Sequence, residues 1–459
     1  MFKRDILAEL QKWHQRETRK PLVIRGARQV GKTTVVRQFA DEFEQFLYLN
    51  LELPEERKPF EEFSNFETLL QSLFFLKNLS LAKRKETLIF IDEIQEVPEA
   101  LQLLRYFYEE SPDIPVIAAG SMLESLFNAD ISFPVGRVEY LVIHPVSFPE
   151  FLGAIDETAA LEQLKNIPLA TFAHGKLMQL FRTYCVIGGM PEIIEQYAKD
   201  RDLAALATTY ESLLVSYMDD VEKYAVSDAQ ANYIRHAIRS CFAEAGKRIK
   251  FQGFGNSSYK SREMGEALRI LEKALLVHLI YPQTSPVLPL QPDYGRSPRL
   301  QFLDTGMLNY FVGIQKEIIG TEDLNAVYGG TMIEHIVGQE LLARQYSALH
   351  GLNFWVREKT TTVAEIDYIY QYDGKLIPIE VKSGADGRLR ALHMFMDMAP
   401  HNMAIRFYAG ELSISFLTTP GEKTFYLLNL PYFLVSQIEA YLRWFEEEIK
   451  KIIAEESKS

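Results

Sequence analysis

Short, nearly uninterrupted apolar runs alternate with helical patterns over the first third of the chain. The runs at 21–25, 87–92 and 114–120 suit strands buried on both faces, and apolar residues after the first run recur at helical spacing, as at Val36 and Phe39. Alternation of this kind is typical of a parallel sheet covered by helices. We therefore predict an α/β protein, and its 459 residues exceed what one hydrophobic core usually serves, so several domains are expected.

The pattern changes further along the chain. Residues 200–310 are mostly helical by spacing, and LRILEKALLVHLIYP at 268–282 passes from helical spacing into a strand. Residues 364–384, AEIDYIYQYDGKLIPIEVKSG, carry β-branched and aromatic residues on both sides of Asp373-Gly374, which predicts a β-hairpin with a two-residue turn. The amphipathic run from 439 onward predicts a helix for packing or oligomer formation.

Composition and charge set limits on location and partners. The chain has no apolar run of the ~20 residues that span a bilayer, no secretory signal at its start and two cysteines, so we expect a cytoplasmic protein without a membrane partner. A net charge of −13 argues against a protein that coats nucleic acid over its whole surface. Residues 235–275 go against this trend, with nine Lys or Arg and four acids.

The first apolar run leads into a segment with the spacing of a phosphate-binding loop. G-x-x-x-x-G-K-[ST] runs from Gly26 to Thr33 and is followed by a helical pattern, which is the setting that this loop requires. Glycines let backbone N–H groups turn toward phosphates at a helix N-terminus. We predict that Lys32 reaches the β- and γ-phosphates of ATP and that Thr33 ligates Mg²⁺. The predicted nucleotide-binding residues are Gly26, Ala27, Arg28, Gln29, Val30, Gly31, Lys32, Thr33 and Thr34.

Four later residues extend the predicted nucleotide site. The run TLIFID ends in Asp92 and Glu93, where we expect Asp92 to hold Mg²⁺ and Glu93 to orient or deprotonate the attacking water. Ser121, after the next apolar run, has two interpretations, a γ-phosphate sensor or a helix cap. Arg137 also has two interpretations. It is either an arginine finger that reaches the nucleotide of a neighbouring subunit in a homo-oligomer or one half of a structural salt bridge.

These motifs carry a resemblance over nearly the whole chain. GARQVGKTT, IFIDEIQ, AAGS, GRVEYLVIHPVSFPEF and YCVIGGMPEII resemble a prokaryotic family of AAA-type ATPases that pair this module with a C-terminal domain of unknown function. The resemblance implies a parallel αβα core with a helical lid, then a winged-helix-like segment. The expected division is 1–150 ATPase core, 151–210 lid, 211–312 winged-helix-like domain, 313–440 restriction-endonuclease-like domain and 441–459 C-terminal helix.

The winged-helix-like segment contains the basic stretch. In the resembling family, SSYKSREMGEALRI would hold the recognition helix, and this makes DNA an expected partner through residues 235–275. The candidate phosphate contacts are Tyr259, Lys260, Arg262 and Arg269. The alternative is a lid or coupling domain whose basic residues are solvated, because basic patches are common on proteins that never meet DNA.

The hairpin places acidic and basic side chains on one face. Centring it on Asp373-Gly374 sets Asp367 opposite Glu380 and Glu365 opposite Lys382, and strand alternation then puts Asp367, Glu380 and Lys382 on the same face. Two opposed carboxylates are unfavourable unless a positive charge lies between them. A divalent metal is the natural candidate, since hard cations prefer carboxylate oxygens.

This arrangement resembles the D-x(n)-E-x-K core of restriction-endonuclease-like nucleases. Glu334, on the helix predicted over 330–346, would be the additional acid, and the expected metal ligands are Glu334, Asp367 and Glu380. Lys382 would polarise the attacking water or the developing charge in a metal-assisted phosphodiester hydrolysis. Two hypotheses follow: an ATP-controlled enzyme that acts on DNA, or a nucleotide-dependent switch or scaffold with a catalytically silent C-terminal domain and protein partners.

Overall fold

The computed structural model describes residues 2–62, 64–120, 136–315, 331–349, 351–359, 362–382 and 389–456. Within it the chain forms two compact units. The first unit comprises Met1–His144 together with the short segments Lys273–Leu276 and Gln345–His350, and the second comprises the remainder. No helix in these described ranges has the length and apolar character needed to cross a membrane.

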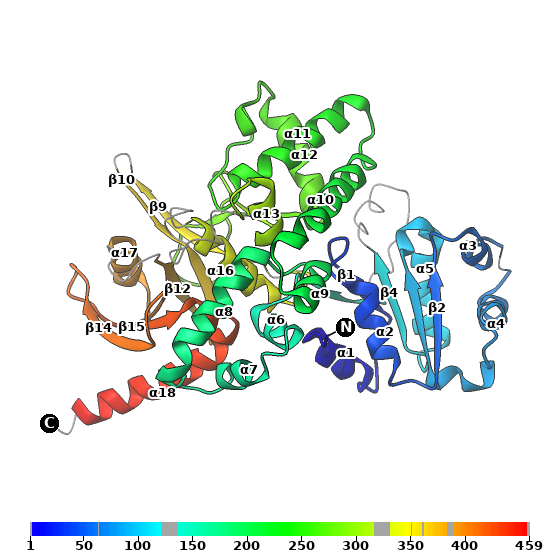
Figure 1. The fold of residues 1–459 in the computed structure, drawn as a ribbon, viewed down its shortest axis with the longest axis horizontal. Helices are drawn as coiled ribbons and strands as arrows, with labels where there is room; N and C mark the ends of the chain where they lie inside the picture. Colours follow the sequence, from blue (N-terminus) through cyan, green and yellow to red (C-terminus); the bar gives the residue numbers. More distant parts are fainter. Residues whose placement is uncertain are drawn as a thin grey trace. The chain divides into compact units, whose positions relative to one another are not determined.

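The first unit is built on a five-stranded, all-parallel sheet in the order β2-β3-β4-β1-β5 (Figure 1). Its central strands are apolar and fully buried, as expected for a sheet that is covered on both faces. The predicted parallel α/β core is thus confirmed. The strands are β1 (Leu22–Arg25), β2 (Gln45–Asn50), β3 (Thr87–Asp92), β4 (Val116–Gly120) and β5 (Glu139–Val142).

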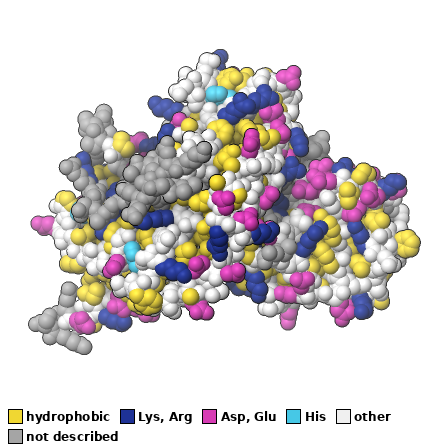
Figure 2. All heavy atoms as spheres, in the orientation of Figure 1, with side chains coloured by type: hydrophobic (Ala, Val, Ile, Leu, Met, Phe, Trp, Pro, Cys, Tyr) yellow, Lys and Arg dark blue, Asp and Glu magenta, His cyan; other side chains and the backbone are white. Residues whose placement is uncertain are grey.

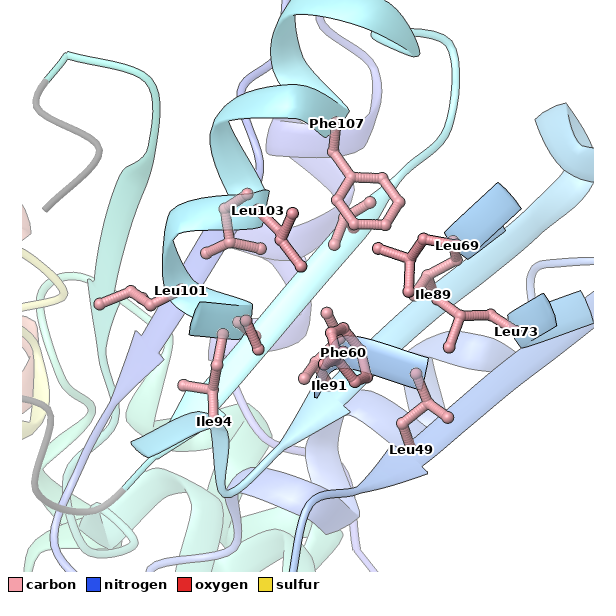
Figure 3. Packing of buried hydrophobic residues seen from close by; sticks show 14 of the residues in the cluster. Leu49, Phe60, Leu69, Leu73, Ile89, Ile91, Ile94, Leu101, Leu103 and Phe107 are labelled. Carbon is pink, nitrogen blue, oxygen red and sulfur yellow. The ribbon is translucent and has the colours of Figure 1, made fainter. Parts of the chain in front are cut away.

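Helices cover this sheet, and their apolar faces form its core. Phe107 of α5 and Leu69 and Leu73 of α4 point toward Ile89 and Ile91 of β3, and all five are buried (Figure 3). Burial of each large apolar side chain contributes roughly 1.5–3 kcal/mol. The helices are α1 (Ile6–His14), α2 (Lys32–Ala40), α3 (Pro54–Glu61), α4 (Phe66–Leu76) and α5 (Pro98–Glu110).

The edge strand β5 is completed by a distant segment of the chain. Val142 N donates to the carbonyl of Tyr346 at 2.9 Å, while Ile143 N donates to Arg25 O at 2.8 Å. Tyr346 belongs to the short segment Gln345–His350 of the same unit. The first unit therefore contains a backbone partner that lies about 200 residues away in sequence.

From residue 145 onward the chain is helical before it turns to β structure. The second unit begins with α6 (Phe148–Ala154), whose start is fixed by a capping box between Ser147 and Glu150. One helix ends at Ile187 and the next begins at Pro191, with Gly188 and Gly189 in the break between them. The further helices are α7 (Thr158–Leu164), α8 (His174–Ile187), α9 (Pro191–Asp200), α10 (Ala207–Glu222), α11 (Asp228–Glu244), α12 (Ser261–Lys273), α13 (Thr305–Phe311), α16 (Thr331–Ala343), α17 (Arg390–Met398) and α18 (Ile438–Glu456).

In the described part of the second unit, the strands form three sheets. The largest is mixed, in the order β11-β12-β13-β15-β14, and the smaller ones are β10-β9-β7 and the antiparallel pair β6-β8. The predicted passage from helix to strand near residue 275 is observed between α12 and β6. The strands are β6 (Val277–Ile280), β7 (Pro282–Gln283), β8 (Arg299–Phe302), β9 (Phe354–Lys359), β10 (Thr362–Ile366), β11 (Tyr368–Tyr372), β12 (Lys375–Val381), β13 (Met403–Tyr408), β14 (Ser413–Thr418) and β15 (Thr424–Pro431).

The predicted hairpin is confirmed near its turn and wrong beyond Asp367. Tyr368 lies opposite Ile379 and Tyr372 opposite Lys375, in the expected register. The preceding strand β10 leaves this sheet and pairs with β9, where Glu365 lies opposite Val356 and not opposite Lys382. The strand breaks because the Asp367 carboxylate accepts from Val381 N at 2.7 Å, a backbone donor that a continuing strand would have used.

Two buried carboxyl groups hold α16 and α13 against the start of the second unit. Glu340 Oε1 accepts from Tyr184 Oη at 2.7 Å and from Phe148 N at 3.0 Å. Asp304 accepts from Gly189 N at 2.5 Å and from Met307 N at 2.9 Å. Since buried polar groups are costly without partners, this network specifies how these helices pack.

Candidate functional site

The loop between β1 and α2 has backbone features that require glycine. Gly31, the N-cap of α2, has a φ of +96°, a conformation that residues with a side chain rarely adopt. A Cβ placed on Gly26 would lie 2.5 Å from Ile143 Cγ2 and 2.8 Å from Ile143 O. Both glycines of the motif are therefore required by the local backbone, and the loop opens onto the N-terminus of α2.

Lys32 spans this loop from the first turn of α2. Its Nζ donates to the carbonyl oxygens of Gly26 at 3.0 Å and Ala27 at 2.9 Å, and the side chain is buried. The ammonium thus joins the end of the loop to its beginning. This places a positive charge inside the ring of backbone that a phosphate group would enter.

Thr33 and Asp92 are brought together from α2 and β3. Thr33 Oγ1 donates to Asp92 Oδ2 at 2.7 Å, and Asp92 Oδ1 accepts from Glu93 N at 3.1 Å. Burial raises the pKa of Asp92, opposed by the Thr33 hydrogen bond. Hydroxyl and carboxylate oxygens at this separation are the hard donors that Mg²⁺ takes in proteins, so the residues fit this ion.

Three side chains that the sequence did not single out, those of Tyr48, Arg37 and Gln95, also lie at this site. Tyr48 Oη, on β2, lies 3.4 Å from Asp92 Oδ2, and the Arg37 guanidinium lies 4.8 Å from the Tyr48 ring centre. Gln95 Nε2 donates to Glu93 Oε2 at 2.6 Å, and Glu93 itself has a φ of +51°. Its left-handed backbone is uncommon for glutamate and directs Glu93 away from the regular strand.

Two predicted basic residues, Arg137 and the loop residue Arg28, form ion pairs with glutamates of the same unit. Arg137 Nε donates to Glu109 Oε1 at 2.9 Å in a solvent-exposed pair, and Arg28 lies 3.5 Å from Glu52. Ser121 lies outside the described residues. The salt-bridge interpretation of Arg137 therefore has a partner within the same chain.

A second polar cluster forms around the bend at Asp367. Glu380 is buried, and its Oε1 forms an ion pair with Lys382, while its Oε2 has no hydrogen-bond partner among the described residues. Burial, with the nearby Asp367 charge, raises the pKa of Glu380 to about 8. Burial and Asp367 likewise raise the pKa of Glu334, on α16, to about 7. The predicted acids Glu334, Asp367 and Glu380 thus sense one another's charge.

Arg299, on β8, is the residue of this cluster that sequence reasoning missed. Its side chain is 4% exposed, its Nη1 donates to Asp367 O at 2.7 Å, and its Nη2 forms an ion pair with Glu365. In the described ranges, no group of three or more His, Cys, Asp or Glu stands arranged as a ready-made metal site. The carboxylates are instead engaged by Arg299 and Lys382.

Four of the nine basic residues of segment 235–275 form ion pairs within the chain: Arg235, Lys247, Arg248 and Arg262. Arg235 makes two hydrogen bonds of 2.6 Å with Glu222, and Arg262 donates to Glu266 at 3.1 Å. Tyr259 packs against Tyr233 with ring centres 4.9 Å apart. On the face drawn in Figure 2, Lys and Arg are interspersed with Asp and Glu. This pairing reduces the positive charge available to a nucleic acid.

Comparison with known proteins identifies the first unit and leaves the second open. Family models match an AAA domain at residues 18–152, a domain of unknown function (DUF8612) at 178–318 and a domain of unknown function (DUF4143) at 329–433. No curated protein matches the chain. With the parallel sheet and the loop described above, residues 18–152 form an AAA-type P-loop ATPase domain.

Solved structures give weaker likenesses. The Walker-type ATPase PABY2304 of Pyrococcus abyssi is 15% identical, covers 68% of this chain and 96% of its own, and has a TM-score of 0.43. Drosophila ORC bound to DNA is 13% identical, covers 57% of this chain and 65% of its own, and has a TM-score of 0.24. With TM-scores this low, neither structure carries an argument for this chain.

Proposed function

We propose that this chain binds ATP with Mg²⁺ at residues 26–34 and hydrolyses it. The observation that carries the proposal is the Thr33 hydroxyl hydrogen-bonded to Asp92 at 2.7 Å, beside a loop that Lys32 closes from inside. Bound Mg²⁺ would supply charge neutralisation at the β- and γ-phosphates. Thr33 and Asp92 would hold that ion, Lys32 and the loop N–H groups would bind the phosphates, and Glu93 would orient the attacking water.

Gln95 fixes where Glu93 can act. The 2.6 Å hydrogen bond from Gln95 Nε2 holds one carboxylate oxygen of Glu93. The other oxygen is then left to orient water, which is the role that a general base needs. Asp92, whose pKa is raised by burial, would be held in its ionised form by the cation.

The test of this site is ATP binding by Lys32→Ala, with Lys12→Ala as its matched control. Lys12 lies in the same unit but is exposed and paired with Glu9. We expect Lys32→Ala to lose ATP binding in calorimetry and Lys12→Ala to retain it. Tight binding by a folded Lys32→Ala variant would refute the assignment of the loop.

For the second unit, we propose a nuclease-like carboxylate site in a domain spanning 313–440, preceded by a lid at 151–210 and a winged-helix-like domain at 211–312. The buried, unpartnered Oε2 of Glu380 favours a cation site, because such an atom costs free energy unless something positive reaches it. Glu334, Asp367 and Glu380 would hold the metal, and Lys382 would act on the phosphodiester of a DNA bound through residues 235–275.

The competing function is a nucleotide-dependent switch or scaffold with protein partners. It is favoured by the ion pair of Lys382 with Glu380 and by the paired basic residues of 235–275. A cleavage assay with Mg²⁺ or Mn²⁺ and plasmid DNA separates the two functions. Under the nuclease function, Lys382→Ala abolishes cleavage and Lys375→Ala, on the same strand but paired with Glu446, preserves it. Absence of cleavage by the unaltered protein would favour the switch.

A further inference from the structure

A buried arginine near the start of the chain reaches the phosphate-binding loop. Arg4 Nη1 donates to the carbonyl oxygen of Val30 at 3.0 Å, and its Nη2 donates to that of His144 at 2.8 Å. Only 8% of Arg4 is exposed, and arginine is rarely buried unless its donors are paired. The roles assigned above to the nucleotide site do not use this residue.

The backbone that carries Arg4 is held from two sides. Arg4 precedes α1, and its carbonyl oxygen accepts from Leu7 N at 3.1 Å. α1 and α2 lie side by side (Figure 1), and Gln38 Nε2 of α2 donates to Phe2 O at 2.9 Å. α1 is itself anchored by three buried side chains, those of Ile6, Leu10 and Trp13. The guanidinium is thus presented to the loop from a fixed position.

The second contact of Arg4 leads to a segment that also packs against the loop. His144 directly follows Ile143, whose N–H donates to Arg25 O at 2.8 Å at the end of β1. Ile143 is the residue that a Cβ on Gly26 would meet. Residues 143–144 therefore contact the first glycine of the loop directly and its last part through Arg4.

The contact with Val30 determines the orientation of one peptide of the loop. In a trans peptide, the carbonyl and the following N–H point in opposite directions. Because Val30 O is turned toward the buried Arg4, the Gly31 N–H points to the other side of this peptide. A phosphate-binding loop needs its N–H groups turned toward the phosphates.

A guanidinium is well suited to hold such a peptide. It is planar, stays charged in proteins and offers several donors in fixed directions, so it can bind two carbonyl oxygens of different segments at once. Hydrogen bonds from a charged donor are also stronger than those between neutral groups. A lysine at this position would keep the charge but not the fork that reaches both Val30 O and His144 O.

We infer that Arg4 is a positioning residue for phosphate binding, which turns the Gly31 N–H into the loop by holding Val30 O. The inference rests on the ATP-binding function proposed above and adds the residue that sets the loop. Arg4 acts through the Val30–Gly31 peptide and not by touching the nucleotide. Its loss should therefore weaken the binding of ATP and of inorganic triphosphate by the same factor.

Arg19 provides a matched control in the same unit. Its Nη2 donates to Asp113 O at 2.7 Å and its Nη1 to His14 O at 3.4 Å, so it also joins two backbone carbonyls. Asp113 precedes β4, whereas the phosphate-binding loop follows the carboxyl end of the parallel strand β1. Arg19 thus acts at the opposite edge of the sheet, and its loss should affect stability without affecting the loop.

The experiment measures binding of ATP and of inorganic triphosphate to the full chain by calorimetry, with a melting curve for each variant. We expect Arg4→Met to weaken both ligands roughly tenfold or more, as for the loss of one charge-assisted hydrogen bond. Arg4→Lys should bind with intermediate affinity. Arg19→Met should lower the melting temperature and keep the affinities of the parent chain, which separates a loss of positioning from a loss of stability.

Each outcome decides between specific claims. A folded Arg4→Met variant that binds both ligands as the parent chain does, a loss that spares inorganic triphosphate, or an equal loss in Arg19→Met overturns the inference and leaves the ATP site standing. A parent chain that binds neither ligand overturns both.

A measurement on the unaltered chain covers the case in which Arg4→Met fails to fold. Isotope labelling of valine carbonyl carbons and glycine nitrogens selects Val–Gly peptides in NMR spectra, and Val30→Ile identifies the signal of Gly31. We expect the Gly31 amide proton to move downfield when ATP is added, because it donates to a phosphate oxygen. An unmoved signal in a chain that binds ATP would overturn the inference.

Discussion

Replacing Glu340 by glutamine tests the buried network that holds α16. Glu340 Oε1 accepts from Tyr184 Oη and Phe148 N, and glutamine can keep both hydrogen bonds because its carbonyl oxygen occupies the same position. Burial raises the pKa of Glu340 to about 7 from its ordinary 4.5, assisted by the Glu150 charge and opposed by the two hydrogen bonds and Arg344. The substitution therefore removes an ionisation and little else.

The size and sign of the effect follow from this pKa. A rise from 4.5 to about 7 corresponds to about 3 kcal/mol. Because the folded state holds the proton more tightly than the unfolded chain, this stability is fully present below pH 4.5 and is lost as the pH rises through about 7. Glutamine cannot ionise, so it should match the parent protein near pH 4.5 and exceed it by about 3 kcal/mol at pH 8.

The assay compares thermal midpoints from pH 5 to pH 8. We expect Glu340→Gln to melt roughly 5 °C above the parent chain at pH 8 and within a degree of it at pH 5. Glu266→Gln, at an exposed residue of α12, is the control and should show a difference that does not vary with pH. A Glu340→Gln difference that is equally flat would refute burial of an ionisable Glu340.

Three further substitutions test the nucleotide site. Gly26→Ala should weaken ATP binding about tenfold or more, because the new Cβ would clash with Ile143 Cγ2 and the Ile143 carbonyl oxygen. Normal affinity of this variant for a fluorescent ATP analogue would contradict the loop geometry. Thr33→Val should bind ATP with an affinity that Mg²⁺ does not increase, since the hydroxyl beside Asp92 is lost. If Mg²⁺ still strengthens ATP binding by this variant in calorimetry, the Thr33 hydroxyl is not a ligand of the ion. Arg137→Ala should leave both the thermal midpoint and ATP turnover nearly unchanged, because its exposed ion pair with Glu109 contributes little to stability. A large fall in turnover that depends on protein concentration would instead show that Arg137 acts as an arginine finger between subunits.

The nucleotide-binding part of the chain was predictable because its signals are local. The spacing from Gly26 to Thr33 specifies a loop and the helix after it, and the apolar run that ends at Asp92 specifies a neighbouring strand. In a parallel sheet the carboxyl ends of strands share one edge, so the approach of Asp92 to Thr33 follows from the fold class. Gln95 gave no comparable signal, since its contact depends on the left-handed backbone at Glu93.

The carboxylate cluster was predictable only in part. Asp373 and Gly374 both have positive φ, as the turn signal required, and they set the register from Tyr368 to Tyr372. The strand break at Asp367 was not predictable, because it depends on competition between β12 and β9 for the same segment. Arg299 was missed because it reaches Glu365 across 66 positions, and no periodicity reports such a contact.

The hydrogen bond from Val142 to the Tyr346 carbonyl affects how the ATPase could be isolated. A fragment that stops at residue 144 would keep all five strands but would leave the outer edge of β5 without this acceptor. An unpaired edge of this kind invites association between copies. Self-association of such a fragment would thus arise from the cut itself and would be a poor guide to the assembly of the intact protein.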